Sequence, residues 1–198
     1  GGEGSGKSTQ CKRLVNKLVD DGVNSILIHE PGNTPMGEQV RKWIKSKNIK
    51  SSIAETYLFC AARAELCKSV IEPALDKGIT VIVDRFIHST VAYQGYGRGL
   101  NVDLIDSMNL FAIDKILPQL TIFFDIDPVT AFDRLVRKSL DRMELMGVEY
   151  LTKVREGYLK IMDLNPIRFK RINCNDLDII SVNNKVVSLL KLHLNKEI

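Results

Sequence analysis

The sequence predicts an α/β fold in which helices cover both faces of a mostly parallel sheet. Short apolar runs rich in β-branched residues alternate with helical stretches, which is typical of βαβ crossovers. A glycine-rich segment with the spacing of a phosphate-binding loop leads directly into the first helical stretch. The 198 residues, 44% hydrophobic and 26% charged, suit one domain over residues 1–198 with a sizeable core.

The first half of the chain contains two strand signals separated by helical patterns. An amphipathic helix is expected over 7–20, and the run SILIH predicts a strand over 25–29. Helical patterns follow over 37–46 and 52–77, and the run ITVIVD then predicts a strand over 79–84.

The second half repeats this order. The elements expected there are helices over 102–116, 128–138, 148–164 and 180–194, and strands over 120–126 (LTIFFDI) and about 169–173. Ligands of such sheets bind beyond the carboxyl ends of the strands. The segments where we expect a site are therefore 1–9, 29–34, 84–99 and 125–128.

The opening segment matches the complete pattern G-x-x-x-x-G-K-S, from Gly1 to Ser8. Its glycines allow successive backbone N–H groups to face a polyphosphate, while Lys7 reaches the β/γ oxygens and Ser8 reaches Mg²⁺. A chance glycine-rich turn is the alternative, and the amphipathic helix behind the motif argues against it. Because such a loop hangs between a buried strand and a helix, we expect several apolar residues upstream of Gly1.

The strand over 79–84 ends in Asp84, and Arg85 follows it. A carboxylate that leaves a strand beside a phosphate loop suits the positioning of metal or water, and Arg85 suits a transferring phosphoryl group. A plain surface ion pair is the alternative. A G-protein is disfavoured because Asn16-Lys17 and Asn184-Lys185 lack the Asp of an NKxD motif, and no DxxG motif follows a strand.

Two stretches suggest a second ligand. Phe59 and Arg63 are i and i+4 on one helix face, so a ring and a guanidinium could bind a base together. From spacing alone, a core Phe with an unrelated surface Arg explains them at least as well. The polar and aromatic segment 89–99 suits substrate contact, but a flexible loop with ordinary turn glycines is also possible.

A basic stretch near the middle of the second half suggests a mobile lid at about 134–147. Arg134, Arg137 and Lys138 share one helix face, and Arg142 follows in a segment where the periodic pattern lapses. Closure of such a lid would exclude water and bring positive charge to a transferring phosphoryl group. A solvated charged face is the alternative.

Composition limits the partners. The net charge of +4 suits a phosphate-bearing ligand and is too weak and scattered to indicate nucleic acid. Four cysteines, none in a CxxC pair or at metal-ligand spacing, indicate reduced thiols in a cytosolic protein. There is no run of 18 apolar residues, so no membrane association is expected.

Motifs along the whole chain resemble those of the thymidylate kinase family of the bacterial type. They are EGSGKST at the start, EPG after the strand expected over 25–29, LFCAAR on the long helix, DRFIHSTVAYQGYGRG from the end of the strand expected over 79–84, and DRME in the expected lid. The resemblance implies transfer of the γ-phosphoryl group of ATP, with Mg²⁺, to dTMP, giving dTDP. It also implies a cytoplasmic homodimer with a P-loop NTPase-type three-layer fold, whose five-stranded parallel sheet has the phosphate-loop strand at its centre.

Site residues follow from the same resemblance. The ATP site would comprise Gly1, Gly2, Glu3, Gly4, Ser5, Gly6, Lys7, Ser8, Thr9, Arg137 and Arg142. The dTMP site would comprise Glu3, Glu30, Pro31, Arg41, Phe59, Arg63, Arg85, Thr90, Tyr93 and Gln94. The catalytic residues would be Lys7, Asp84, Arg85 and Arg137, and the magnesium ligands Ser8 and Asp84, directly or through water.

Individual roles are implied as well. Phe59 would stack on thymine, and Arg63, Thr90 and Gln94 would reach its polar edge. Arg41 would hold the dTMP phosphate, Tyr93 would pack near the sugar, and Glu3 would face the 3′-hydroxyl.

Three positions depart from the family pattern: His29 stands for an arginine, Asn33 for a glycine and Phe86 for a tyrosine. Two rival functions remain at this point: a monophosphate kinase for another base, and a P-loop module that binds nucleotide without transferring phosphate.

Overall fold

The computed structural model describes residues 1–46, 48–136 and 147–194. Its strands are β1 (Ser25–His29), β2 (Thr80–Asp84), β3 (Thr121–Asp125) and β4 (Phe169–Asn173). Its helices are α1 (Lys7–Asp20), α2 (Pro35–Lys45), α3 (Ser52–Leu66), α4 (Glu72–Asp76), α5 (Ile87–Thr90), α6 (Val102–Ile113), α7 (Pro128–Val136), α8 (Gly147–Leu164) and α9 (Ile179–Leu194), with two π-helical segments, η1 (Cys67–Ile71) and η2 (Val91–Gly97).

The strands form two parallel pairs. β1 pairs with β2 in a register that places His29 opposite Asp84, and β3 pairs with β4 so that Asp125 lies opposite Asn173. Parallel pairing brings the carboxyl ends of both strands in a pair to one edge, where ligands are expected. Parallel strands between helices are therefore confirmed, whereas the described residues contain two two-stranded sheets and do not confirm one five-stranded sheet.

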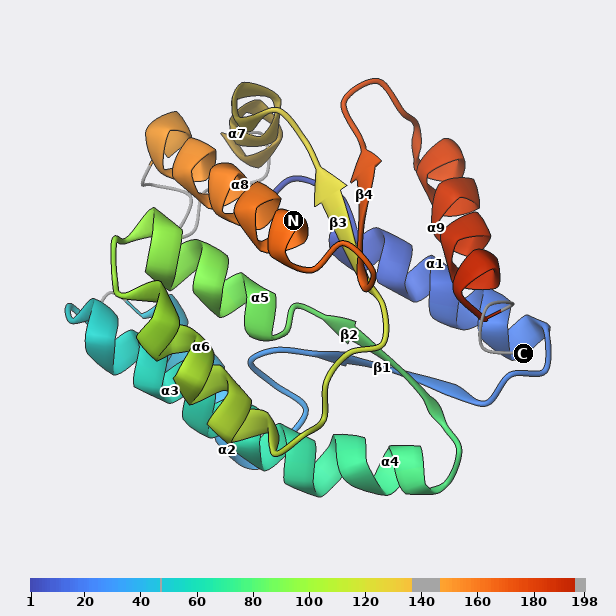
Figure 1. Cartoon of the computed structure of the whole chain (residues 1–198), viewed down its shortest axis with the longest axis horizontal. Helices are drawn as coiled ribbons and strands as arrows, with labels where there is room; N and C mark the ends of the chain where they lie inside the picture. Colours follow the sequence, from blue (N-terminus) through green and yellow to red (C-terminus); the bar gives the residue numbers. More distant parts are fainter. Residues whose placement is uncertain (47, 137–146, 195–198) are drawn as a thin grey trace.

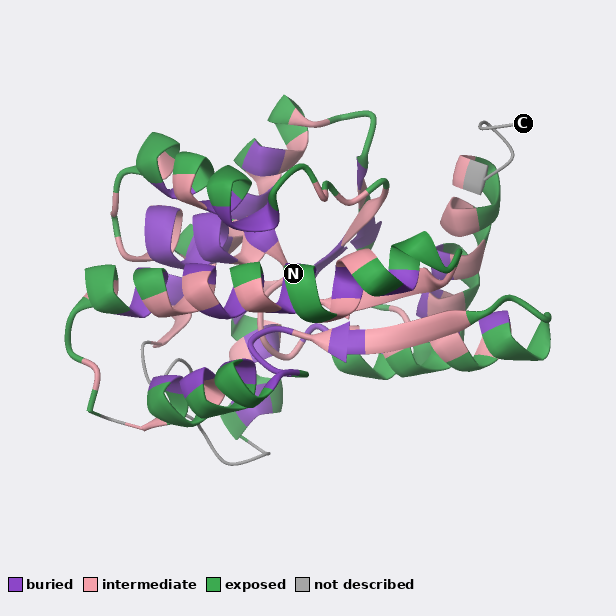
Figure 2. Ribbon diagram, turned by 90° about the horizontal axis from the view of Figure 1, so that it is seen from below, coloured by how far each residue is buried: buried purple, intermediate pink, exposed green. Residues whose placement is uncertain are grey.

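Alternation along the strands directs neighbouring side chains to opposite faces. Phe124 packs in a cluster with residues of α1 and α9, whereas Phe123 packs in another cluster with residues of α8. Ile28 packs with η1 and with Ile113 of α6. Helices thus cover both faces, with α1 and α9 side by side on one of them (Figure 1), and the buried residues lie on the inward sides of helices and strands (Figure 2).

The expected helix over 52–77 is divided, because the wider π-helical segment η1 separates α3 from α4. The helix expected over 102–116 ends earlier, at Ile113, because Asp114 and Lys115 adopt left-handed backbone conformations with φ of 39° and 71°. The helix expected over 37–46 begins earlier, at Pro35, where the side chain of Thr34 accepts the Gly37 N–H at 2.9 Å.

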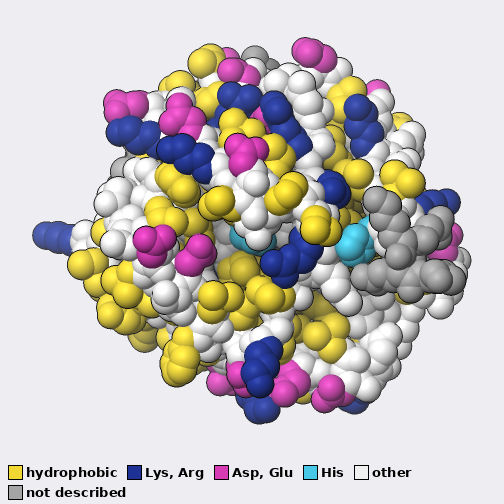
Figure 3. All heavy atoms as spheres, viewed as in Figure 1, with side chains coloured by type: hydrophobic (Ala, Val, Ile, Leu, Met, Phe, Trp, Pro, Cys, Tyr) yellow, Lys and Arg dark blue, Asp and Glu magenta, His cyan; other side chains and the backbone are white. Residues whose placement is uncertain are grey.

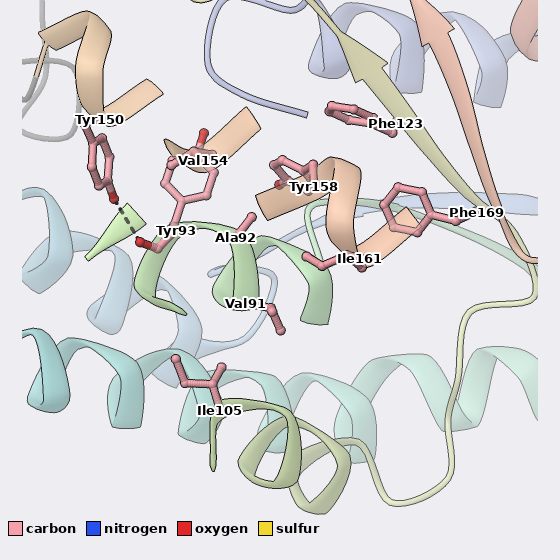
Figure 4. Packing of buried hydrophobic residues seen from close by; sticks show 10 residues of the cluster. All are labelled: Val91, Ala92, Tyr93, Ile105, Phe123, Tyr150, Val154, Tyr158, Ile161 and Phe169. Carbon is pink, nitrogen blue, oxygen red and sulfur yellow. Dashed lines mark hydrogen bonds between the residues drawn. The ribbon is translucent and has the colours of Figure 1, made fainter. Parts of the chain in front are cut away.

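The flexible loop considered for 89–99 is wrong. Most of this segment is the end of α5 and the helical η2, and Val91, Ala92 and Tyr93 are buried against Tyr150, Val154 and Tyr158 of α8 (Figure 4). Gly97 is required by this close packing, since a Cβ there would lie 2.7 Å from the ring of Tyr150.

Candidate active site

The phosphate loop ends at the amino end of α1. Gly6 is the N-cap with φ of 86° and provides no side-chain cap, so the first N–H groups of α1 remain suited to an anion. Lys7 Nζ donates to the carbonyl oxygen of Gly2 at 2.5 Å and lies 3.5 Å from Ser5 Oγ. Burial, and after it the charge of Arg85, lowers the pKa of Lys7 to about 8.

Helix α7 packs directly on this loop. Gly4 has φ of 70°, and a Cβ there would lie 2.8 Å from the carbonyl oxygen of Ala131. Arg134, in the last turn of α7, donates to the carbonyl oxygen of Gly4 at 3.3 Å. The helix that leads into the expected lid segment, and Arg134 at the start of that segment, therefore contact the loop itself.

Ser8 and Asp84 lie together although 76 residues separate them, because α1 begins where β2 ends. Ser8 Oγ donates to Asp84 Oδ2. Asp84 Oδ1 is buried and has no hydrogen-bond partner among the described residues. A hydroxyl and a carboxylate oxygen without a partner fit the oxygen-rich coordination of Mg²⁺.

The described residues contain no group of three or more His, Cys, Asp or Glu side chains that could hold a metal ion.

Glu3 joins the phosphate loop to the segment after β2. Its carboxylate pairs with Arg85 NH2 at 2.5 Å and accepts a hydrogen bond from the Tyr93 hydroxyl. The guanidinium of Arg85 also lies over the Tyr93 ring, 5.0 Å from its centroid. Burial alone would raise the pKa of Glu3, but the charges of Arg85 and Lys7 and the Tyr93 hydrogen bond lower it to about 2.

A cavity of ≈190 Å³ opens beside this group of residues. All ten residues expected to bind dTMP line it: Glu3, Glu30, Pro31, Arg41, Phe59, Arg63, Arg85, Thr90, Tyr93 and Gln94. Ile44, Lys45 and Ser89 also line it and were not predicted. The spacing of Arg41, Ile44 and Lys45, at i, i+3 and i+4 on α2, was a signal that could have identified two of them.

Arg63 is at the base of the cavity and is not the surface arginine that spacing alone allowed, since it is only 1% exposed. Its Nε and NH2 groups donate to the Glu30 carboxylate at 2.5–3.0 Å, and NH2 also donates to Thr90 Oγ1 at 3.0 Å. NH1 donates to Asn109 Oδ1 at 2.5 Å. The buried ion pair and these hydrogen bonds fix the plane of the guanidinium.

Gln94 is held by residues that the sequence reasoning did not identify. Its Nε2 donates to Glu55 Oε1 at 3.0 Å, and Arg98 NH2 lies 3.2 Å from the same oxygen. Glu55 is 1% exposed. Glu55 lies four residues before Phe59 on α3, so the two side chains share one face of the helix. A charged residue on the inward face of a helix was the sequence signal that could have identified Glu55.

Comparison with known proteins identifies the family. The family model described as "Thymidylate kinase" matches residues 1–186. The chain belongs to the thymidylate kinase family. A curated thymidylate kinase of Pelodictyon phaeoclathratiforme (strain DSM 5477 / BU-1) is 39% identical and covers 95% of this chain and 91% of its own length. One of Thermoanaerobacter sp. (strain X514) is 37% identical, with 97% and 95% covered.

A solved structure is similar as well. The crystal structure of thymidylate kinase from Ehrlichia chaffeensis superposes with a TM-score of 0.79 at 35% identity, and the match covers 95% of this chain and 93% of that one. The P-loop NTPase fold expected from the motifs is therefore confirmed. None of the described helices is both long and apolar enough to cross a membrane.

The departures from the thymidylate kinase pattern are accommodated locally. Asn33 adopts φ of 60°, a conformation that asparagine tolerates better than most residues, and its side chain accepts the His29 N–H at 2.7 Å. His29 Nε2 lies 3.5 Å from Glu38 Oε1, and neither His29 nor Asn33 is among the residues that line the cavity. The ring of Phe86 lies under Arg63, 5.6 Å from its guanidinium carbon.

Arg137, Arg142 and most of the lid expected at about 134–147 lie outside the described residues. Their parts in the family mechanism remain predictions from the sequence.

Proposed function

We propose that this chain transfers the γ-phosphoryl group of ATP to dTMP, giving dTDP and ADP. The observation that carries the proposal is the position of Glu3, which belongs to the phosphate loop and also lines the cavity beside Arg85. A residue that belongs to the phosphate loop and also lines the neighbouring cavity suits a reaction in which the phosphates of two bound nucleotides meet. Membership of the thymidylate kinase family supports the choice of acceptor.

ATP would bind with its phosphates against the loop from Gly1 to Gly6 and the amino end of α1, while Lys7 turns from Gly2 toward the β/γ oxygens. Ser8, Asp84 and water would hold Mg²⁺. When bound, the ion would neutralise charge on the transferring phosphoryl group.

The acceptor would occupy the cavity with its base toward α3 and its phosphate toward Arg85. Phe59 would stack on thymine, and Arg63 and Gln94 would hydrogen-bond to its edge, with Thr90 beside them. Arg41, which donates to the Pro31 carbonyl at 3.1 Å, would reach the dTMP phosphate. Tyr93 would pack near the sugar, and Glu3 would accept from the 3′-hydroxyl.

The chain's own residues would act mainly by alignment. The dTMP phosphate is already an anionic nucleophile near neutral pH, so no strong general base is needed. Lys7 and Arg85 would stabilise charge on the transferring group, and Arg137 would add to this from the lid. Asp84 would position Mg²⁺ and the attacking phosphate of dTMP relative to each other.

The overall organisation is proposed on the same basis: one kinase domain over 1–198 with a lid at about 134–147, and a five-stranded sheet in which a further strand separates the two observed pairs.

We also propose a homodimer. Apolar side chains on α3 and α6 are exposed, Phe111 by 92%, Leu104 by 59% and Tyr57 by 60%, and such side chains favour association. Hydrophobic atoms are visible among charged ones of both signs on the face in Figure 3.

Light scattering tests the homodimer, with Phe111→Glu as the variant expected to be monomeric.

A cytoplasmic location is proposed because all four cysteines are free thiols, which are typical of a reducing compartment.

An acceptor panel tests the activity. ADP formation from ATP and Mg²⁺ is measured with dTMP, dUMP, AMP, GMP and CMP, and dTMP is expected to give the highest kcat/KM. A different best acceptor would identify a monophosphate kinase for another base. ADP formation that is slow and unaffected by every acceptor would indicate a nucleotide-binding module.

A further inference from the structure

We propose that Glu55 is a positioning residue for base recognition, because it fixes the orientation of the Gln94 side-chain amide. The inference rests on the proposed function, since it assumes that the cavity receives the base of a nucleoside monophosphate. It concerns a residue that does not line the cavity and that would act only through Gln94.

The geometry leaves the amide one favourable orientation. Gln94 and Glu55 are each 1% exposed, so water cannot readily replace the bond of 3.0 Å between Gln94 Nε2 and Glu55 Oε1. A carboxylate in an ion pair has no hydrogen to donate, and Arg98 provides the pairing charge at 3.2 Å. Rotating the amide by 180° would place its oxygen against the carboxylate oxygen, which is repulsive.

In this orientation Gln94 keeps its carbonyl oxygen and the second N–H of Nε2 for other partners, and the proposal assigns the carbonyl oxygen, which can only accept, to a ligand in the cavity. Arg63 presents the opposite character, because a guanidinium only donates. Its five N–H groups include one on Nε that faces Glu30, two on NH2 that face Glu30 and Thr90, and one on NH1 that faces Asn109. The second N–H of NH1 has no partner within the described part of the chain and is the one assigned to a ligand.

An acceptor beside a donor matches the edge of thymine, which has an N–H at position 3 and a carbonyl oxygen at position 4. Cytosine has the reverse pattern, an acceptor nitrogen at position 3 and an amino group at position 4. With Gln94 held by Glu55, cytosine would face acceptor with acceptor and donor with donor. Mismatches of this kind discriminate strongly because the buried polar groups lose their partners.

The test compares dTMP with 5-methyl-dCMP, two acceptors that share sugar, phosphate and methyl group and differ only in this pattern. Glu55→Gln replaces the carboxylate by an amide that can either donate or accept, so the Gln94 amide is no longer confined to one orientation. The ratio of kcat/KM for dTMP to that for 5-methyl-dCMP should fall about tenfold or more. KM for ATP should not change, since Glu55 does not contact the phosphate loop.

Glu65→Gln is the matched control. Glu65 is on the same helix, accepts from Ser69 Oγ at 2.6 Å and does not line the cavity, so its variant should keep the wild-type ratio. Glu55→Asp is the second variant if Glu55→Gln fails to fold. It keeps a negative charge for Arg98 but withdraws the carboxylate from Gln94, and its ratio should also fall.

The outcomes separate the two claims. A wild-type enzyme that does not phosphorylate dTMP contradicts the proposed function. Efficient use of dTMP by wild type, with an unchanged ratio in the folded Glu55 variant, overturns the role of Glu55 alone. A ratio that falls equally in Glu65→Gln also overturns it, because the effect would then not depend on Gln94.

Discussion

Replacing Phe59 by alanine should weaken dTMP binding while leaving the ATP site intact. Phe59 lines the cavity from α3 and packs at the edge of a cluster that contains Val40, Ile44 and Ala62. It is only partly buried, so part of its side chain is available to a base. The variant therefore separates a stacking platform from an ordinary core side chain, the two interpretations that spacing left open.

The magnitudes follow from this position. A base stacked on an aromatic ring contributes about 1–3 kcal/mol, so Kd for dTMP should rise by roughly 5–150-fold. A fully buried Phe→Ala change costs about 3–5 kcal/mol of stability. A partly exposed ring that borders a cavity loses less packing, and we expect about 1–2 kcal/mol, or roughly 2–8 °C in Tm for a chain of this size.

Calorimetric titration with dTMP, thermal unfolding and KM for ATP measure the three quantities. Leu58→Ala is the matched control, because Leu58 is the neighbouring residue, packs against the same cluster and does not line the cavity. It should lose similar stability and keep its dTMP affinity. The stacking role is refuted if the two variants bind dTMP with Kd values within about twofold of each other.

Four further predictions concern charged residues. Burial lowers the pKa of Lys7 to about 8, and a bound polyphosphate would raise it. ATP binding at pH 8 should therefore take up protons, and the affinity for ATP should fall as pH rises above 8. Calorimetry in buffers of different ionisation enthalpy measures this proton uptake, which should vanish in Lys7→Arg. Asp84→Asn should lower kcat on the order of 10²-fold and raise the Mg²⁺ concentration needed for half-maximal rate, and an unaltered Mg²⁺ titration contradicts its assignment as a ligand. Arg137→Ala should lower kcat strongly, by about 10³-fold, with ATP and dTMP binding nearly intact, whereas an unchanged kcat removes Arg137 from the mechanism. Asp125→Asn should cost about 1–2 kcal/mol, or roughly 2–8 °C in Tm, because a buried carboxylate loses its ion pairs with two partly exposed arginines, Arg155 and Arg171; burial raises the pKa of Asp125 but its arginine partners lower it overall, so the Tm difference from wild type should be constant above pH ~5 and shrink as pH falls from the ordinary range of that carboxyl through its lower pKa in the folded state.

The local parts of the fold could be predicted because each depends on a short pattern. The strands over 25–29 and 169–173 and the helix over 7–20 have the bounds that the sequence predicts. Ten of the residues around the cavity could also be named, because the family motifs identify them. Their roles with ligands stay predictions.

Features that depend on packing between distant segments could not be predicted. The segment 89–99 is rich in glycine and looks like a loop, yet it folds as helix because α8 buries it. Glu55 shares a helix face with Phe59, yet no local pattern identifies Gln94 and Arg63 as the partners of Glu55 and Asn109 across the fold. The number of strands in one sheet likewise depends on pairings that no single run encodes.

The position of Glu3 shows how a phosphate loop can tolerate a carboxylate. With a pKa of about 2, Glu3 is ionised throughout the physiological range and pairs with Arg85, whose charge would otherwise lie unpaired near Lys7. The pair holds Arg85 at the junction of loop and cavity, where the residue itself adopts a left-handed backbone with φ of 72°. Because that charge is already partly neutralised, the γ-phosphate needs a further cation in the transition state. We predict that Arg137 supplies it, in which case Glu3 and Arg137 would be complementary parts of one charge balance.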